Sequence, residues 1–189
     1  MTNPMSLRNL SPSPMRGRLC QLRPIIPEDH RILYSIAIAD QVNFRWRYRG
    51  AVPPFEAFIA GLHADVLSQF VVCGLGDPRP AGLVVTYTAD MNNGTTFLGA
   101  VMTPETIGSS IGIEATCLFV RHIFETWNIR RIYMEVVEYN MPFFQSGEGS
   151  LFTIEGCQKE RYYFADKFWD NFLLTIEKEQ VRDFLDRIL

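Results

Sequence analysis

The stretch that decides the fold is Thr103–Ala115, with the sequence TPETIGSSIGIEA. It follows a β-like run at Thr96–Met102 and leads into a run of helical periodicity that ends near Trp127. A strand, a loop of small residues and a helix N-terminus form an anion site, because backbone N–H groups and the positive end of the helix dipole converge there. The stretch therefore predicts a place that holds the pyrophosphate of a cofactor.

The bulk composition narrows the class of protein. With 189 residues, of which 47% are hydrophobic, the chain is long enough for one domain with a sizeable core. A net charge of −3 argues against a general nucleic-acid binder, which usually carries a basic surplus. No apolar run approaches the roughly 18–20 residues that span a membrane, and the N-terminus lacks the apolar core of a signal peptide. We expect a cytoplasmic protein with no membrane or nucleic-acid partner.

Cysteine and histidine spacing does not indicate a metal site. The four cysteines lie far apart with no Cys-x-x-Cys pair, so we expect reduced core residues rather than ligands or disulfides. The three histidines fall on predicted helices and show no ligand spacing. No metal is therefore expected.

Local patterns divide the chain into a tail and one domain. Residues 1–18 are rich in Pro, Ser and Asn without a hydrophobic period, which indicates a flexible tail. Residues 19–189 contain no linker and follow the order β-α-α-β-β-β-α-β-α-β-β, with a helix over roughly Phe55–Leu67 and a short helix starting at Asn140. The strand–helix–strand unit from Thr96 to Val137 predicts a parallel pair with a right-handed crossover.

Several short motifs accompany this order. They are Leu22-Arg23-Pro24 with Glu28-Asp29, Thr103-Pro104-Glu105, Asn140, Phe152-Thr153-Ile154-Glu155-Gly156-Cys157, and a closing hairpin from Tyr162-Tyr163-Phe164 to Trp169-Asp170. Over about Leu19–Glu177 the chain thereby resembles the GNAT acetyltransferase superfamily. Within that superfamily it looks most like the branch of ribosomal-protein N-terminal acetyltransferases and spermidine acetyltransferases.

The resemblance implies an α/β (α+β) fold with a mixed, mostly antiparallel seven-stranded sheet, a central βαβ unit and flanking helices. The sheet would be splayed between the strands at Thr96–Met102 and Ile132–Val137, with acetyl-CoA or another acyl-CoA in the gap. Backbone groups of Ala100, Val101 and Met102 would pair with the pantetheine arm, and N–H groups of Gly108–Ile113 would hold the pyrophosphate. The other cofactor-binding residues would be Ile107, Gly108, Ser109, Ser110, Ile111, Gly112, Ile113 and Asn140.

The resemblance also implies an acyl-CoA-dependent N-acyltransferase that transfers acetyl from acetyl-CoA directly to a primary amine. The acceptor would be a protein N-terminus or a small-molecule amine, and a homodimer is left open. A basic and aromatic loop lies where the family's first two helices flank the acceptor, and three Arg and two rings there would suit an acidic or aromatic acceptor. The alternative is a solvated loop with Trp46 in the core. The candidate acceptor-binding residues are Arg45, Trp46, Arg47, Tyr48 and Tyr87.

Four positions depart from the family's pattern. The family's loop reads Gln/Arg-x-x-Gly-x-Gly/Ala, whereas here Ile107 replaces the polar first residue and Ser110 replaces a Gly. A positive φ at Ser110 would cost roughly 1–2 kcal/mol. The family's catalytic Tyr aligns with Gly147, and the branch's Glu near the start of the fourth strand aligns with Phe97. The alternative hypothesis is therefore a catalytically degenerate GNAT-like domain that binds CoA or a partner.

Transfer to an amine needs a group that accepts the amine's proton and a group that protonates the departing thiolate. Glu138, near the end of the fifth strand, would accept the proton through water, and Ser146 is the nearest hydroxyl for the thiolate. The alternatives are a salt-bridged edge carboxylate and a solvent-facing loop residue. A third hypothesis is a longer acyl donor, because apolar side chains replace polar groups at Phe97, Phe143 and Phe144.

Overall fold

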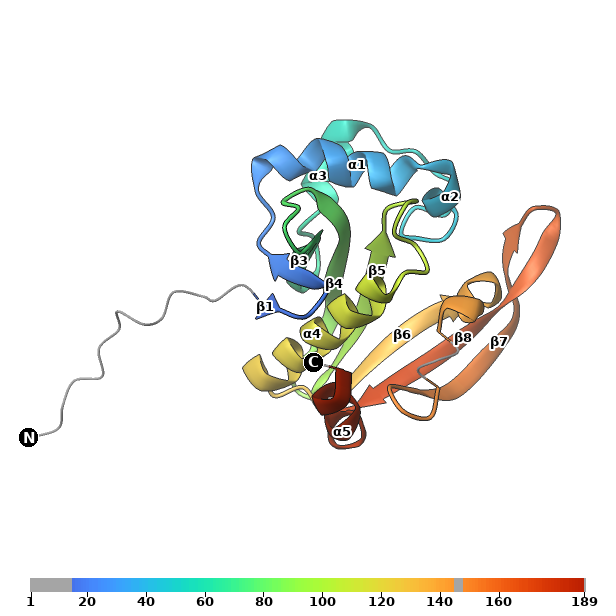
Figure 1. Cartoon of the computed structure of the whole chain (residues 1–189). Helices are drawn as coiled ribbons and strands as arrows, with labels where there is room; N and C mark the ends of the chain where they lie inside the picture. Colours follow the sequence, from blue (N-terminus) through green and yellow to red (C-terminus); the bar gives the residue numbers. More distant parts are fainter. Residues whose placement is uncertain (1–14, 145–147, 189) are drawn as a thin grey trace, which may run out of the picture.

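A computed structural model describes residues 15–144 and 148–188 of the chain (Figure 1). The strands in this part are β1 (Met15–Arg16), β2 (Cys20–Arg23), β3 (Val66–Gly74), β4 (Pro80–Asp90), β5 (Thr95–Met102), β6 (Arg131–Val137), β7 (Thr153–Phe164) and β8 (Lys167–Glu177). The helices are η2 (Pro27–Asp29), α1 (His30–Ile38), α2 (Asp40–Asn43), α3 (Phe55–Gly61), α4 (Ser110–Thr126), η3 (Glu138–Phe143) and α5 (Lys178–Ile188), where η marks a 3-10 helix.

The described strands form one mixed sheet in the order β1-β2-β3-β4-β5-β6-β8-β7. All neighbours pair antiparallel except β5 and β6, which confirms the expected mostly antiparallel architecture. The described part of the sheet has eight strands rather than the seven expected. The additional strand is β1, at the end of the segment predicted to be a tail.

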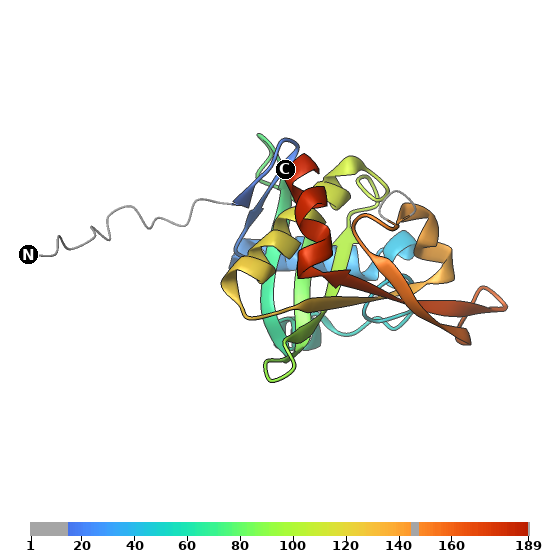
Figure 2. The same ribbon diagram turned by 90° about the horizontal axis from the view of Figure 1, so that it is seen from below.

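Helices cover both faces of the sheet and bury two separate hydrophobic clusters. Helices α1, α2 and α3 lie on one face, whereas α4 and α5 lie on the other (Figures 1 and 2). Val71 and Leu83 pack under α1–α3, while their chain neighbours Val72 and Val84 pack under α4, because successive side chains of a strand point to opposite faces.

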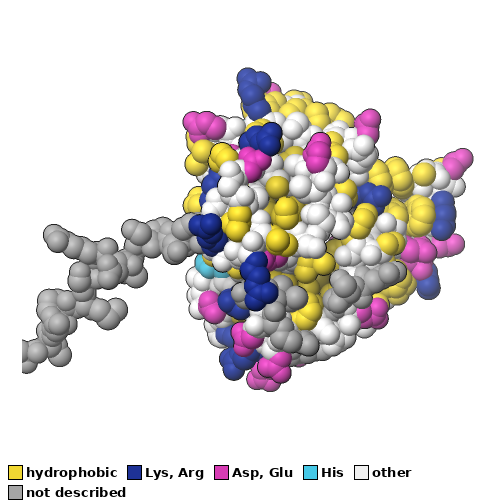
Figure 3. All heavy atoms as spheres, in the orientation of Figure 1, with side chains coloured by type: hydrophobic (Ala, Val, Ile, Leu, Met, Phe, Trp, Pro, Cys, Tyr) yellow, Lys and Arg dark blue, Asp and Glu magenta, His cyan; other side chains and the backbone are white. Residues whose placement is uncertain are grey.

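Within the described ranges, no helix has both the length and the apolar character needed to cross a membrane. On the face shown in Figure 3, Lys and Arg side chains are interspersed with Asp and Glu rather than gathered into a basic patch.

The parallel pair β5–β6, connected through α4, confirms the predicted βαβ unit. The two strands pair only from Thr95–Arg131 to Phe97–Tyr133. Farther along, β5 remains paired with β4 as far as Met102, and β6 remains paired with β8 to its end. The C-terminal parts of β5 and β6 therefore separate, and the sheet opens at its middle.

Two helices differ from the sequence prediction. The helix expected over roughly Phe55–Leu67 ends at Gly61, because the chain pairs with β4 from Val66 onward. The short helix expected to start at Asn140 is the 3-10 helix η3, which begins at Glu138 directly after β6. It contains Pro142, which has no backbone N–H to donate, and this fits a short, tight helix.

The turn between β1 and β2 is held in place by the buried carboxylate of Glu114 on α4. Its oxygens accept hydrogen bonds from the N–H groups of Arg18, Leu19 and Cys20 at 2.8, 2.8 and 2.9 Å. Gly17 passes so close that a Cβ there would lie 2.5 Å from the Glu114 carboxyl carbon. Burial acts to raise the pKa of Glu114, but the N–H bonds outweigh it and lower that pKa. The end of the expected tail is thus fixed to α4.

We expect Glu114→Gln to lower the free energy of unfolding by about 1–3 kcal/mol at pH 7, because the amide accepts fewer of these hydrogen bonds. Urea denaturation followed by circular dichroism measures this change. A carboxyl group whose pKa is lowered by folding stabilises the protein above its unfolded pKa. The difference between the two proteins should therefore shrink as the pH falls through the folded-state pKa of Glu114.

Glu125→Gln is the matched control, since Glu125 lies on the same helix with its side chain exposed. This substitution should change the free energy of unfolding by no more than about 0.5 kcal/mol. Equal effects of the two substitutions would contradict the role assigned to Glu114.

Candidate active site

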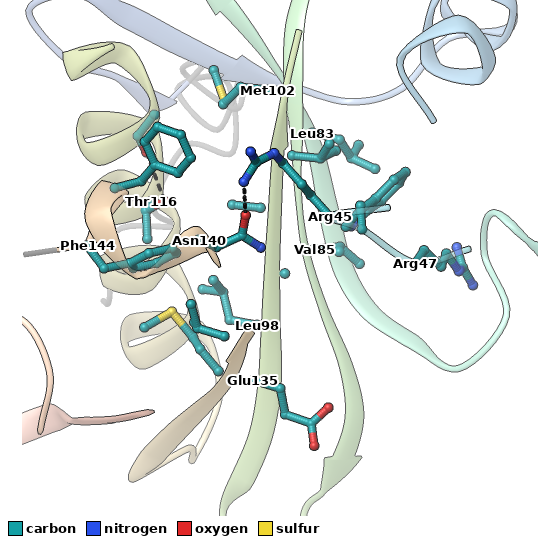
Figure 4. Close-up of a pocket in the computed structure, with 18 of the residues that line it drawn as sticks. Arg45, Arg47, Leu83, Val85, Leu98, Met102, Thr116, Glu135, Asn140 and Phe144 are labelled. Atoms are coloured by element: carbon teal, nitrogen blue, oxygen red, sulfur yellow. Dashed lines mark hydrogen bonds between the residues drawn. The ribbon is translucent and has the colours of Figure 1, made fainter. Parts of the chain in front are cut away.

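A cavity of about 540 Å³ lies where β5 and β6 separate. Its walls come from the separated ends of both strands, the start of α4, η3 and the segment after α2. Leu83 and Val101 belong to the cluster under α1–α3, whereas Leu98 and Met102 belong to the cluster under α4. All four side chains line the cavity, which therefore reaches both faces of the sheet (Figure 4).

Most of the predicted cofactor-binding residues line this cavity. They are Ala100, Val101, Met102, Ile107, Gly108, Ser109, Gly112, Ile113 and Asn140. Ser110 and Ile111 are not part of the lining, because they form the first turn of α4 and Ile111 packs against the hydrophobic cluster on that face. Their backbone N–H groups stand at the start of the helix, where no intrahelical acceptor exists.

The loop before α4 is shaped by a turn and one glycine. The N–H groups of Thr106 and Ile107 donate to the Thr103 carbonyl at 3.0 and 2.9 Å. Gly108 follows with φ 77°, and a Cβ there would lie 3.1 Å from the ring of Phe143. The residue of positive φ is thus Gly108 and not Ser110, so the serine that replaces the family's glycine carries no left-handed strain.

The same loop fits an anion. Ser109 stands at the N-cap position of α4, and its hydroxyl is buried with no hydrogen-bond partner among the described residues. The N–H groups of Ser109 and Gly112 are already used, by the carbonyls of Thr106 and Ser109 at 3.0 and 3.2 Å. The donors left for a phosphate are therefore the Ser109 hydroxyl and the first N–H groups of α4.

Arg45 reaches from the segment after α2 across to η3 (Figure 4). Its Nη1 donates to Asn140 Oδ1 at 2.5 Å and to the Tyr139 carbonyl at 3.2 Å. The guanidinium carbon lies 4.6, 5.6 and 5.5 Å from the ring centroids of Phe44, Tyr139 and Phe143. Burial lowers the pKa of Arg45. Arg45, predicted to bind the acceptor, and Asn140, predicted to bind the cofactor, are thus joined by a hydrogen bond.

The other predicted acceptor residues divide into two groups. Trp46, Arg47 and Tyr87 line the cavity, and Arg49 joins them with its guanidinium 3.8 Å above the ring of Tyr162. Tyr48 does not line the cavity: it packs against the core cluster under α1–α3, with its ring 6.2 Å from that of Phe58.

The carboxylate that faces the cavity is not the one predicted from the sequence. Glu138 does not line it and instead accepts the N–H of Asp170 at 3.4 Å. Glu135, three residues earlier on β6, does line it, together with Asp65. Burial raises the pKa of Tyr87, and the nearby charge of Glu135 adds to that rise. In the sequence of β6, Arg131, Tyr133 and Glu135 alternate with Ile132, Met134 and Val136, and this alternation is the signal that places Glu135 on the face opposite to the buried side chains.

Ser146, the predicted donor to the thiolate, and Gly147, which aligns with the family's catalytic Tyr, lie outside the described residues. Phe97 does not line the cavity; its ring lies between those of Tyr87 and Tyr133, with centroids 5.8 and 5.5 Å away. Across the described ranges, no group of three or more His, Cys, Asp or Glu side chains is placed to hold a metal ion.

Comparisons with known proteins give structural matches only. No family model and no curated protein matches the sequence. A GCN5-related N-acetyltransferase from Brucella melitensis matches with a TM-score of 0.69 and 20% identity over 93% of this chain and 82% of that one. Spermidine N-acetyltransferase from Vibrio cholerae, in complex with CoA and spermine, matches with a TM-score of 0.73 and 17% identity over 85% and 96%.

A probable GNAT-family acetyltransferase from Chromobacterium violaceum matches with a TM-score of 0.70 and 19% identity over 95% of this chain and 97% of that one. At such identities the comparison identifies the fold. The mixed sheet with flanking helices agrees with it. The chain has the fold of the GNAT acetyltransferases.

Proposed function

We propose that the chain is an acyl-CoA-dependent N-acyltransferase that transfers acetyl from acetyl-CoA directly to a primary amine. The observation that carries this proposal is the cavity at the opening of the sheet, which reaches both faces. A donor entering from the α4 side and an acceptor entering from the α2 side would meet there. The neighbour in complex with CoA and spermine supports a site for two such substrates.

On the donor side, the chain offers backbone groups and an anion site. Beyond Phe97, the edge of β5 that faces β6 has no strand partner, so its backbone groups are available to the amides of a pantetheine arm. The Ser109 hydroxyl and the start of α4 would hold the pyrophosphate. Bound acetyl-CoA supplies an activated thioester.

On the acceptor side, we assign proton removal to Glu135. Its side chain lines the cavity and has no hydrogen-bond or ion-pair partner in the described part of the chain. An alkylammonium with a pKa near 10 must lose a proton before its nitrogen attacks. Glu135 would attract the ammonium and accept its proton through water. As the new C–N bond forms, the C–S bond breaks, and the thiolate takes up a proton to leave as CoA.

A thiol-release assay tests the proposed function. We expect the purified protein to bind acetyl-CoA and to release free CoA in the presence of at least one primary amine, faster than acetyl-CoA hydrolyses alone. Binding of acetyl-CoA without release from any amine or peptide in a broad panel would overturn the proposal. That result would favour the non-catalytic CoA-binding alternative.

Glu135→Gln should lower kcat/KM for the amine by about 10²–10⁴-fold, because the amide cannot accept the proton. Glu138→Gln removes the same charge three residues away, outside the cavity, and should leave kcat/KM within about twofold. Steady-state kinetics of both variants between pH 6 and pH 9 measure the difference. A larger loss in Glu138→Gln than in Glu135→Gln would reverse the assignment.

Gly108→Ala should lower the free energy of unfolding by roughly 1–2 kcal/mol and weaken acetyl-CoA binding, because the new Cβ meets both a left-handed backbone and the Phe143 ring. Urea denaturation and calorimetric titration with acetyl-CoA measure the two effects. The control is Gly61→Ala, where a Cβ has no heavy atom within 4 Å. Gly61→Ala should leave acetyl-CoA binding unchanged. If Gly108→Ala also leaves it unchanged, the loop before α4 does not bind the donor.

A further inference from the structure

Three arginines from one short segment line the cavity without an acidic partner. They are Arg45, Arg47 and Arg49. Among the described residues, none of their guanidinium groups lies within salt-bridge distance of a carboxylate. Other arginines of the chain do have such partners, as Arg23 has Asp29 and Arg131 has Glu177. Three guanidinium groups without a carboxylate partner therefore meet at one cavity.

Arg45 is the most enclosed of the three. Its side chain is half-buried, whereas Arg47 and Arg49 are exposed at the rim. Its hydrogen bonds go to oxygens of Gln41, Tyr139 and Asn140, all of them uncharged. A cation that is taken partly out of water without a counter-ion is costly, so an anion that enters the cavity would gain from meeting it.

The carboxylates of the cavity stand apart from Arg45. Glu135 points away from it at the other end of the view in Figure 4. The second carboxylate, Asp65, is exposed and already accepts a hydrogen bond from the Thr88 hydroxyl at 2.8 Å. The lining thus carries three cations and two anions, with Arg45 and Glu135 at different ends, so it suits a molecule with one charge of each sign better than a polycation.

We infer that the acceptor is a primary amine that also carries a carboxylate, with its amino group toward Glu135 and its carboxylate toward Arg45. The inference deepens the proposed function and rests on it. Arg45 then binds the acceptor directly: its Nε and Nη1 donate to Gln41, Tyr139 and Asn140, so Nη2 is the group that would donate to the carboxylate. Arg47 and Arg49 add positive charge at the entrance, which attracts such a molecule.

The first experiment compares matched acceptors with the wild-type protein. The pairs are 4-aminobutanoate against butylamine, and a tripeptide that begins with Glu against one that begins with Gln, with spermidine as a polycation. We expect kcat/KM to be at least about tenfold higher for the carboxylate member of one pair, and spermidine to be the poorest acceptor. The pair that shows the difference distinguishes a small-molecule acceptor from a peptide N-terminus.

The second experiment replaces the arginine. Arg45→Gln should raise KM for the preferred carboxylate acceptor about tenfold or more, and should change KM for its neutral counterpart and the Kd of acetyl-CoA by a much smaller factor. Arg45→Lys, which keeps the charge, should recover part of the loss. The matched control is Arg79→Gln, because Arg79 lies in the β3–β4 turn, is exposed and pairs with Asp77 outside the cavity.

Three results would overturn the inference. Acetylation of butylamine or spermidine as efficient as that of the carboxylate acceptors would overturn the carboxylate inference. That result would leave the transferase proposal intact. An equal KM change for charged and neutral acceptors in Arg45→Gln would also overturn the carboxylate inference. A weaker Kd of acetyl-CoA in that variant, equal in size to the change in acceptor KM, would assign Arg45 to the phosphates of the donor instead.

A binding measurement separates this inference from the proposed function. Calorimetric titration of 4-aminobutanoate and of the Glu-first tripeptide into the CoA-loaded protein needs no turnover. Binding that is lost in Arg45→Gln, in a protein that releases no CoA from any amine, would support the carboxylate site and overturn the transferase. Absence of binding for both ligands would overturn the carboxylate site alone, if other amines release CoA.

Discussion

The early end of the parallel pairing between β5 and β6, after Phe97–Tyr133, is the constraint on which the site depends. In a continuous sheet the backbone groups of both strands would be consumed by hydrogen bonds to each other. Here each strand keeps a partner on its outer edge, β4 for β5 and β8 for β6, so the opening does not unravel the sheet. The fold thereby creates unpaired backbone and a cavity at its centre without losing its core.

Aromatic side chains determine how charge is presented in that cavity. The guanidinium of Arg45 lies among the rings of Phe44, Tyr139 and Phe143, and Phe44 in turn stacks on Phe164 of the β7–β8 hairpin at 3.9 Å. Rings exclude water and attract a cation to their faces. An electrostatic interaction in such surroundings is stronger than the same interaction in water. The segment after α2 and the last hairpin therefore act as one support for a single charge.

Periodicity in the sequence was sufficient for the parts of the fold that local patterns control. Alternation along the strands and the helical period after Gly112 predicted the βαβ unit, and the strand–loop–helix pattern located the anion loop. Strand β1 could not be predicted, because the turn that joins it to β2 is held by Glu114, more than 90 residues away. Which carboxylate faces the cavity also escaped prediction, since the choice between Glu135 and Glu138 depends on where β6 ends and η3 begins.

Two hydrogen bonds between the segment after α2 and η3 each join residues 95 positions apart, Arg45 to Asn140 and Tyr139 to Phe44. Contacts between such distant residues form only after a long segment of chain has closed on itself, which makes them entropically late events. A nascent chain that has emerged only as far as α4 already carries the anion loop but lacks η3, which supplies Tyr139 and Asn140. The loop before α4 is thus encoded locally, whereas the contact between η3 and the segment after α2 requires the folded C-terminal half.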